Sequence, residues 1–261
     1  YTTLNLINCF EDPTFMREVL YSNACHEVFP SPKANFVKLE INGENWGIYA
    51  NVQQIDGTFI QEWFPSNDGT RWRVEGLMGG GMPGQRNPGQ PPGGGMAGGG
   101  MTNGSGALVW LGWDSTSYAS VYKLKKTKEA NPWESLIRAC YILNNMSLQQ
   151  LSDTDTLEKV FDVDQALWLC AFEIVFHDDD GYVNKRGSDY WLYHDPETDR
   201  LHPIQYDGNS SMRSLDNQQW PLFYREDDPS VPLMARLMKI PKYRERYLAH
   251  VRTILNSYFT E

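Results

Sequence analysis

The feature that most constrains the fold is an apolar run that ends in three consecutive aspartates. Residues 166–176 read ALWLCAFEIVF and are followed by His177 and then by Asp178, Asp179 and Asp180. Apolar residues recur at helical spacing around nearly the whole circumference of this run, and a helix of that kind is buried. The C-terminal end of a helix carries partial negative charge, so carboxylates there are unfavourable without a neighbouring positive charge. Other elements must therefore enclose this helix, with a cation or solvent at its end.

A divalent metal ion is the cation that the residues favour. Asp189 begins the strand that follows the acidic loop, and Asp207 ends a later strand that returns towards the base of that loop. With Asp180 and Asn209 they form a converging set of oxygen ligands, which Mg²⁺ or Mn²⁺ accepts more readily than zinc does. The alternative is a solvated acidic turn.

The remaining patterns predict an α+β fold with two lobes, of which the first is strand-rich and the second helix-rich. The turn pair Asn42-Gly43, between alternating segments, predicts a hairpin over 35–55. A helix is expected to start at Asp12 as N-cap, with Phe15, Val19 and Leu20 on one face. Further strands are expected at 70–75, 107–113, 120–128, 189–195 and 200–207, and helices at 12–29, 56–64, 131–146, 154–161, 164–176 and 231–259, the last broken at Pro241.

A glycine-rich segment interrupts these patterns. Residues 77–106 hold 13 of the chain's 22 Gly and contain GGGM three times. The segment has no GK[ST] ending and no helix after it, which excludes a phosphate-binding P-loop. Its composition predicts a flexible insertion, and a loop that covers a ligand is the alternative.

Charge and cysteine content limit the partners and the compartment. The chain has 33 acidic and 23 basic residues, a net charge of −10, which disfavours binding to nucleic acid. No apolar run approaches the roughly 20 residues of a membrane-spanning helix. The chain begins YTTLNLINC, so we expect a processed or excised form whose targeting signal lies upstream. The four cysteines lack zinc-site spacing, and both disulfide pairing and buried free thiols stay open for Cys9, Cys25, Cys140 and Cys170.

Several motifs in a fixed order together resemble the spore coat protein H (CotH) family, an atypical branch of the protein-kinase-like fold. The matching stretches are LNLIN with DPTFMREVL, FVKLEINGENWGIYANVQQID, YKLKKTK, DDDGYVNKRGSDYWLYHDP, HPIQYDGN and PLMARLMKIPKYRERYL. They cover nearly the whole chain apart from the glycine-rich segment, and their residues are most similar to those of the environmental bacterial members. The resemblance implies one domain over residues 1–261, truncated at its N-terminus, and an extracytoplasmic protein.

The resemblance also implies roles for individual residues. Asp180 would orient and deprotonate the acceptor hydroxyl, while Asp207, in PIQYD, and Asp189 would hold the metal on the triphosphate of ATP. Lys125 matches a family lysine that we take to face the nucleotide, and a solvated strand face is its alternative. Asn209 completes the expected metal ligands.

Two further residues are expected at the nucleotide. Gln53 stands where kinase-like members commonly carry a Glu that helps to anchor the nucleotide site, and Arg73 could reach phosphate from its strand. The expected activity is transfer of the γ-phosphoryl group of ATP, with Mg²⁺ or Mn²⁺, to a Ser, Thr or Tyr hydroxyl of a protein. At Gln53 the family commonly carries Glu, and at Asp189 it more usually carries Asn. These two differences leave open a catalytically inactive pseudokinase that acts as a surface or coat-assembly binding protein.

Overall fold

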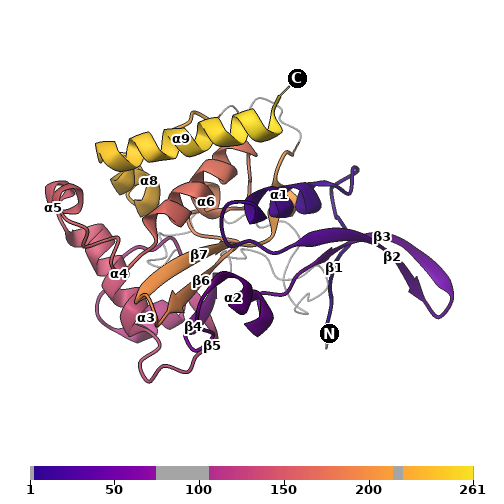
Figure 1. The fold of residues 1–261 in the computed structure, drawn as a ribbon, viewed down its shortest axis with the longest axis horizontal. Helices are drawn as coiled ribbons and strands as arrows, with labels where there is room; N and C mark the ends of the chain where they lie inside the picture. The colour runs from indigo at the N-terminus through magenta and orange to yellow at the C-terminus, as the bar shows by residue number, and fades with distance from the viewer. Residues whose placement is uncertain (1–2, 75–105, 214–219, 261) are drawn as a thin grey trace, which may run out of the picture.

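Two antiparallel sheets and a layer of helices make up the part of the chain that the computed structural model describes, residues 3–74, 106–213 and 220–260. The predicted α+β class is confirmed. The glycine-rich segment 77–106 falls almost entirely outside the described residues. Figure 1 shows the three-stranded sheet at one side of the molecule and the long C-terminal helix across its top.

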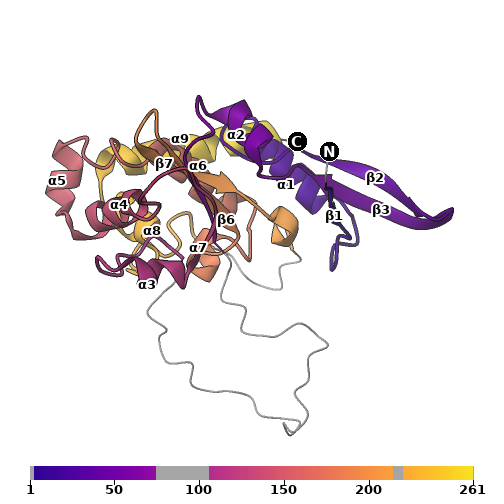
Figure 2. The ribbon, with the colours of Figure 1, turned by 90° about the horizontal axis from the view of Figure 1, so that it is seen from below.

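The first sheet contains the hairpin that the sequence predicts. Its strands are β1 (Asn5–Ile7), β2 (Ala34–Ile41) and β3 (Glu44–Val52), in the order β1-β3-β2. Asn42 and Gly43 take the left-handed conformation, with φ of 54° and 83°, that a tight turn between twisted strands requires. The far end of the hairpin projects away from the rest of the molecule (Figures 1 and 2).

The second sheet separates two apolar clusters. Its strands are β4 (Thr70–Val74), β5 (Tyr122–Lys126), β6 (Tyr190–Asp195) and β7 (Arg200–Gln205), in the order β5-β4-β6-β7. One face places Trp72 and Leu192 in the main core, and the other places Tyr193 and Ile204 against α2 (Gly57–Trp63). Because β7 is an edge strand, Pro203 can sit within it without removing a bond to a further strand.

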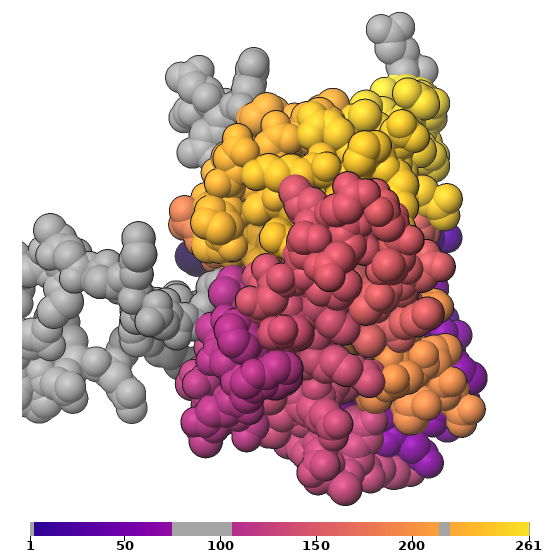
Figure 3. Space-filling model, turned by 90° about the vertical axis from the view of Figure 1, so that its left-hand side faces the viewer, coloured from indigo at the N-terminus to yellow at the C-terminus, as the bar shows by residue number. Residues whose placement is uncertain are grey.

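The predicted buried helix is α6 (Val163–Val175), which packs between β7 and the long helix α9 (Pro241–Tyr258). Phe172 of α6 is fully buried, and such burial typically stabilises the fold by about 1.5–3 kcal/mol. Helices α8 (Pro232–Leu237) and α9 are separated at Pro241, as predicted. The space-filling view shows the α8–α9 segment above the helices that precede α6 (Figure 3). The other helices are α1 (Arg17–His26), α3 (Ser115–Ala119), α4 (Glu134–Asn145), α5 (Leu148–Asp153), α7 (Tyr182–Lys185) and the 3₁₀ turn η1 (Gly208–Ser210).

The predicted start of the first helix is wrong. The Asp12 carboxylate accepts the N–H groups of Thr14 and of Arg17, both at 3.0 Å, but it closes a turn that precedes the helix. Phe15 has a φ of 61°, which interrupts the right-handed path, so α1 begins at Arg17. Phe15 and Leu20 are also 41% and 45% exposed and do not join the buried face on which Val19 lies.

The predicted strand at 107–113 is not formed. Leu108 and Gly112 take left-handed φ angles of 64° and 95°, which a strand cannot accommodate. The N–H of Leu108 donates to the Tyr122 hydroxyl at 2.9 Å instead of to a neighbouring strand. Tertiary hydrogen bonding therefore overrides the apolar strand pattern.

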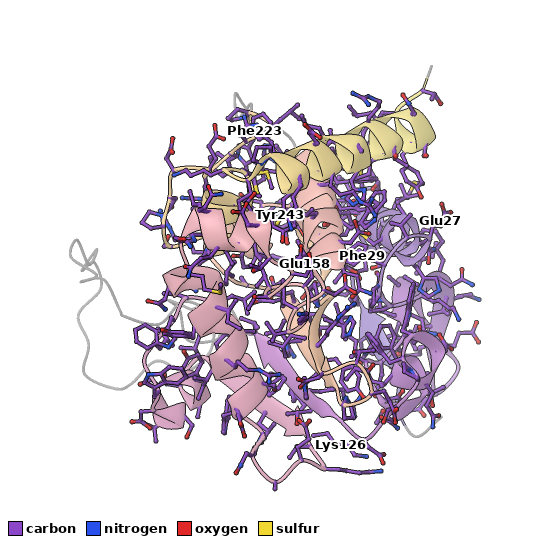
Figure 4. The ribbon with its side chains drawn as sticks, turned by 60° about the vertical axis from the view of Figure 1, so that its left-hand side comes forward. Glu27, Phe29, Lys126, Glu158, Phe223 and Tyr243 are labelled. Atoms are coloured by element: carbon purple, nitrogen blue, oxygen red, sulfur yellow. The ribbon has the colours of Figure 1, made fainter. Side chains whose placement is uncertain are left out.

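The predicted helix at 154–161 is also wrong, and the helix lies earlier as α5. Ser147 and Gln150 form a reciprocal capping box that starts α5. Residues 155–161 form turns, and Phe161 bridges to Leu201 of β7. Glu158 accepts the Tyr243 hydroxyl of α9, and both side chains are labelled in Figure 4.

The four cysteines are all free and buried. The disulfide alternatives are thus not formed, and the thiols serve as small apolar groups. Among the described residues, no helix combines the length and the apolar character that crossing a membrane requires.

Candidate functional site

Two acidic segments that lie far apart in the sequence run side by side in the structure. One follows α6 and contains Asp179, and the other follows β7 and contains Ser210. The N–H of Met212 donates to the Phe176 carbonyl at 2.8 Å, and the N–H of Asp179 donates to the Ser210 carbonyl at 3.3 Å. These hydrogen bonds bring the loop predicted to hold the base next to the loop predicted to hold the metal.

Asp180 is the accessible carboxylate of the first loop, with 41% of its side chain exposed. The Ser210 hydroxyl donates to its Oδ2 at 2.9 Å, and the ammonium of Lys185 lies 3.6 Å from its Oδ1. Asn209 Oδ1 lies 3.0 Å from the same Ser210 hydroxyl, whose single hydrogen serves one acceptor at a time. Asp180 thus has one oxygen bound from the neighbouring loop and one that faces a cation.

The predicted metal ligands Asp189 and Asp207 lie in the same electrostatic environment as Asp180. The pKa of Asp189 is raised to about 7, by burial first and then by the charges of Asp207 and Asp180, while Arg73 opposes the rise. Burial also raises the pKa of Asp207, again with Arg73 opposing and Asp180 adding to the rise. Asp189 and Asp207 therefore lie within electrostatic range of each other, of Asp180 and of Arg73.

Three residues in or beside the acidic segments have an uncommon backbone conformation. His177, Asp189 and Asp207 have φ angles of 54°, 48° and 61°. The left-handed region costs an L-residue about 1–2 kcal/mol. Such strain concentrates at functional sites, where the surrounding structure fixes the side chain's direction.

Asp207 also has an unusual buried oxygen. Its Oδ1 is buried and has no hydrogen-bond partner among the described groups. A buried carboxylate oxygen without a partner is unfavourable by about 1–3 kcal/mol or more. A hard cation would supply the missing partner, so the donors Asp207, Asp189 and Asn209 fit Mg²⁺ or Mn²⁺.

The carboxylates do not by themselves form a complete metal cage. Within residues 3–74, 106–213 and 220–260, no three or more Asp, Glu, His or Cys side chains converge closely enough to hold a metal ion. Mg²⁺ is usually bound by one or two carboxylates, and phosphate oxygens and waters complete its shell. This arrangement therefore suits a cation that arrives with a phosphate ligand.

Arg73 and Lys125 lie on the sheet face that leads to Asp207. The guanidinium of Arg73 stands 4.7 Å from the centre of the Tyr206 ring. Lys125 Nζ stands 5.7 Å from the centre of the Trp191 ring, and Trp191 is the register partner of Arg73. Two cationic side chains thus extend over neighbouring aromatic rings on one side of the second sheet.

Gln53 takes part in a different set of contacts. Its Oε1 accepts the N–H of Lys33 at 3.1 Å, and its Nε2 donates to Glu62 at 3.1 Å. Lys33 and Glu62 are themselves paired at 3.0 Å. These bonds tie the end of β3 to α2, and a contact between Gln53 and a nucleotide stays a prediction.

Glu173 is a buried residue that the sequence reasoning missed. Its two carboxylate oxygens accept the N–H groups of Tyr182 at 2.9 Å and Val183 at 2.7 Å, so it caps the start of α7. Burial raises its pKa to about 8. The signal was present in the sequence, because Glu173 is the sole charged residue within the apolar run 166–176.

The other two aspartates of the triplet shape the loop. Asp178 is 3% exposed, accepts the N–H of Asp180 at 3.3 Å, and has a pKa raised well above its usual value by burial and then by Glu173. The Asn184 side chain donates to the carbonyl and to Oδ1 of Asp179, both at 2.8 Å. Glu18 of α1 is a further buried carboxylate near Asp207, and no periodicity or motif in the sequence distinguishes it.

One protein family matches the chain. The family model described as CotH kinase protein matches residues 1–261, the whole chain. No curated protein matches the sequence. The chain belongs to the CotH kinase family.

Proposed function

We propose that this protein is a metal-dependent kinase that transfers the γ-phosphoryl group of ATP to a Ser, Thr or Tyr hydroxyl of a protein. The supporting observation is the pairing of the two acidic loops, which sets the exposed Asp180 beside the buried Asp207 and Asp189. Phosphoryl transfer requires a base at the acceptor hydroxyl and charge stabilisation at the phosphates, held in a fixed relation.

Each residue has a distinct part in this proposal. Asp180 accepts the proton of the acceptor hydroxyl late in the transfer, which an ordinary ionised and accessible carboxylate can do. Asp207, Asp189 and Asn209 hold the cation. A bound Mg²⁺ or Mn²⁺ neutralises charge on the β- and γ-phosphate oxygens. Arg73 and Lys125 donate to phosphate from the sheet.

The wider setting follows from the family. We infer a single domain of two lobes, in which the three-stranded sheet and α1 face the helix-rich part across the paired loops. The association of the family with the spore coat supports an extracytoplasmic location. The partner is a protein substrate and not a nucleic acid, in keeping with the net charge of −10.

The second candidate is a pseudokinase that binds surface or coat proteins without catalysis. Two observations favour it. Gln53 has its amide engaged by Lys33 and Glu62. Asp189 adds a carboxylate, with a pKa raised to about 7, at a site that must also accept a triphosphate.

Substitution of the two central aspartates tests the proposal. Asp207→Ala should abolish stabilisation by ATP with Mn²⁺ in a thermal-shift assay, because it removes the cation ligand. Asp180→Ala should keep that stabilisation and lose transfer of label from γ-labelled ATP to the protein. Asp227→Ala is the matched control, since its side chain is 89% exposed and pairs with Lys239. If the Asp207 and Asp180 variants both bind ATP with Mn²⁺ like the parent, the assigned roles are wrong. If the parent protein binds ATP with Mn²⁺ but transfers no label, the pseudokinase is favoured.

A further inference from the structure

Glu18 is a buried carboxylate that approaches the acidic loops from α1. It is 2% exposed and lies in the first turn of that helix. Its Oε1 accepts the Ser22 hydroxyl at 2.9 Å. Its Oε2 is buried and has no hydrogen-bond partner among the described residues. One oxygen is therefore satisfied within α1, and the other lacks a donor.

Close packing fixes α1 against the segment that follows Asp207. A Cβ added to Gly208 would lie 2.2 Å from Cδ1 of Tyr21, so only glycine fits between the two elements. The N–H of Gly208 lies near the Glu18 carboxylate, outside hydrogen-bond geometry, and favours its charged form. Glu18 is thus positioned against the residue next to Asp207 by contacts that leave little freedom.

The pKa of Glu18 agrees with this packing of α1 against the segment after Asp207. The pKa of Glu18 is raised to about 8. Burial is the largest cause, the charge of Asp207 is the next, and the charge of Asp189 contributes less. Glu18 Oε2 and Asp207 Oδ1 are therefore two buried acceptors, on different elements, that both lack a donor. Two such carboxylates in one buried place are stable together when they share a proton or a cation.

We propose that Glu18 supplies a further carboxylate to the divalent-cation site, from α1, beside Asp207. The inference rests on the cation of the proposed function and adds a ligand from the first part of the chain. The described residues hold no ready-made group of three such side chains, so phosphate and water would complete the shell of the cation. Cation binding then links α1 to the loop after β7.

Binding of Mn²⁺ alone to the full chain, followed by electron paramagnetic resonance of the free ion, tests this ligand. Glu18→Gln keeps the shape and removes the charge, so its affinity for Mn²⁺ should fall by at least the roughly 10–100-fold that the loss of an outer-shell partner causes. Glu18→Asp keeps the carboxylate on a shorter side chain, so its affinity for Mn²⁺ should lie between those of the parent and Glu18→Gln. Glu27→Gln is the matched control at the C-cap of the same helix, where the side chain accepts the Tyr258 hydroxyl, and it should bind like the parent (Glu27 is labelled in Figure 4).

A second measurement separates ligation from a structural role. Without metal, Glu18→Gln should unfold at the same temperature as the parent or higher, because a neutral amide replaces a buried carboxyl group whose ionisation burial disfavours. A merely structural Glu18 would instead lower that temperature and leave the affinity for Mn²⁺ unchanged. Equal Mn²⁺ affinity in the parent, Glu18→Gln and Glu18→Asp overturns the inference and indicates a shared proton.

The two proposals fail in different ways. If Asp207→Ala loses Mn²⁺ while both Glu18 variants retain it, Glu18 is not a ligand and the proposed kinase stands. If the parent itself binds no Mn²⁺, either alone or with ATP, the proposed function fails and the inference falls with it.

Discussion

At the scale of single residues, Ser210 controls the direction of the proposed base. Its hydroxyl donates to Oδ2 of Asp180, and its carbonyl accepts the N–H of Asp179. With Oδ2 bound in this way, Oδ1 is the oxygen that an acceptor hydroxyl can approach, and Lys185 lies 3.6 Å from it. The acceptor and the transferred phosphoryl group would therefore meet a nearby ammonium, which favours the developing negative charge.

Removal of this hydroxyl should impair transfer more than binding. Ser210→Ala leaves Asp180 free to rotate, so we expect the rate of phosphoryl transfer to fall about tenfold or more. The affinity for ATP with Mn²⁺ should change little, because Asp207 and Asp189 are untouched. Single-turnover transfer and calorimetric titration measure the two effects separately.

Ser211→Ala provides the matched control for that variant. Ser211 is the adjacent serine and is fully buried, but its hydroxyl has no hydrogen-bond partner among the described groups. Its loss should leave both the transfer rate and the affinity near those of the parent. Equal rates in the two alanine variants would show that Ser210 does not position Asp180.

At the scale of elements, the four-residue helix α7 determines where the acidic loop ends. Glu173, from the buried helix α6, binds both of the first N–H groups of α7 and so places the loop relative to the core. Gly181 precedes α7, and a Cβ there would lie 2.6 Å from Cδ of Glu173. The absence of a side chain at this position lets the carboxylate reach the helix.

Gly181→Ala should therefore destabilise the protein. Because the added methyl group meets a buried and fully bonded carboxylate, we expect the free energy of unfolding to fall by about 1–3 kcal/mol, the usual cost of overpacking. Chemical denaturation followed by tryptophan fluorescence measures the change.

Gly57→Ala is the comparison for Gly181→Ala. A Cβ at Gly57 would lie 2.7 Å from Nδ2 of Asn67, which is the far end of a side chain that can move aside. Alanine also favours the helical position that Gly57 occupies in α2. A similar loss of stability in both variants would contradict the special role of the contact between Gly181 and Glu173.

At the scale of the whole molecule, apolar burial is distributed unevenly. The main cluster joins one face of the second sheet to the helices α4, α6, α8 and α9. The cluster beneath the first sheet is small and contains Cys9, Val19, Ala34, Ala50 and Val52. Beyond that cluster the hairpin exposes large side chains, with Trp46 54% and Ile48 53% exposed.

This difference predicts unequal rates of amide hydrogen exchange. Amides of β2 and β3 near the Asn42-Gly43 turn should exchange far faster than those of β6 and β7, because few buried apolar contacts resist local opening there. Hydrogen exchange followed by mass spectrometry resolves the two regions within one sample. Comparable protection of both would mean that another surface covers the hairpin in solution.

The sequence by itself determined the elements whose signals are local. The hairpin depends on the left-handed angles of Asn42 and Gly43, the break before α9 depends on Pro241, and α6 depends on an apolar surface that surrounds the helix. The order of the acidic residues also predicted that Asp207 would return near the loop of Asp180, and a shared metal site for Asp180, Asp189 and Asp207 stays a prediction. Each of these signals comes from residues close in the chain or from the return of one predicted strand.

Only the tertiary structure decided the start of α1, the loop at 107–113 and the environment of each carboxylate. The sequence did not show that Asp178 is buried while the neighbouring Asp180 is exposed. It also did not show that Glu18 and Ser210 approach the acidic loop from distant segments of the chain. Burial and the charges of distant neighbours set the pKa and the hydrogen bonds of a carboxylate, and both depend on which surfaces meet when the chain folds.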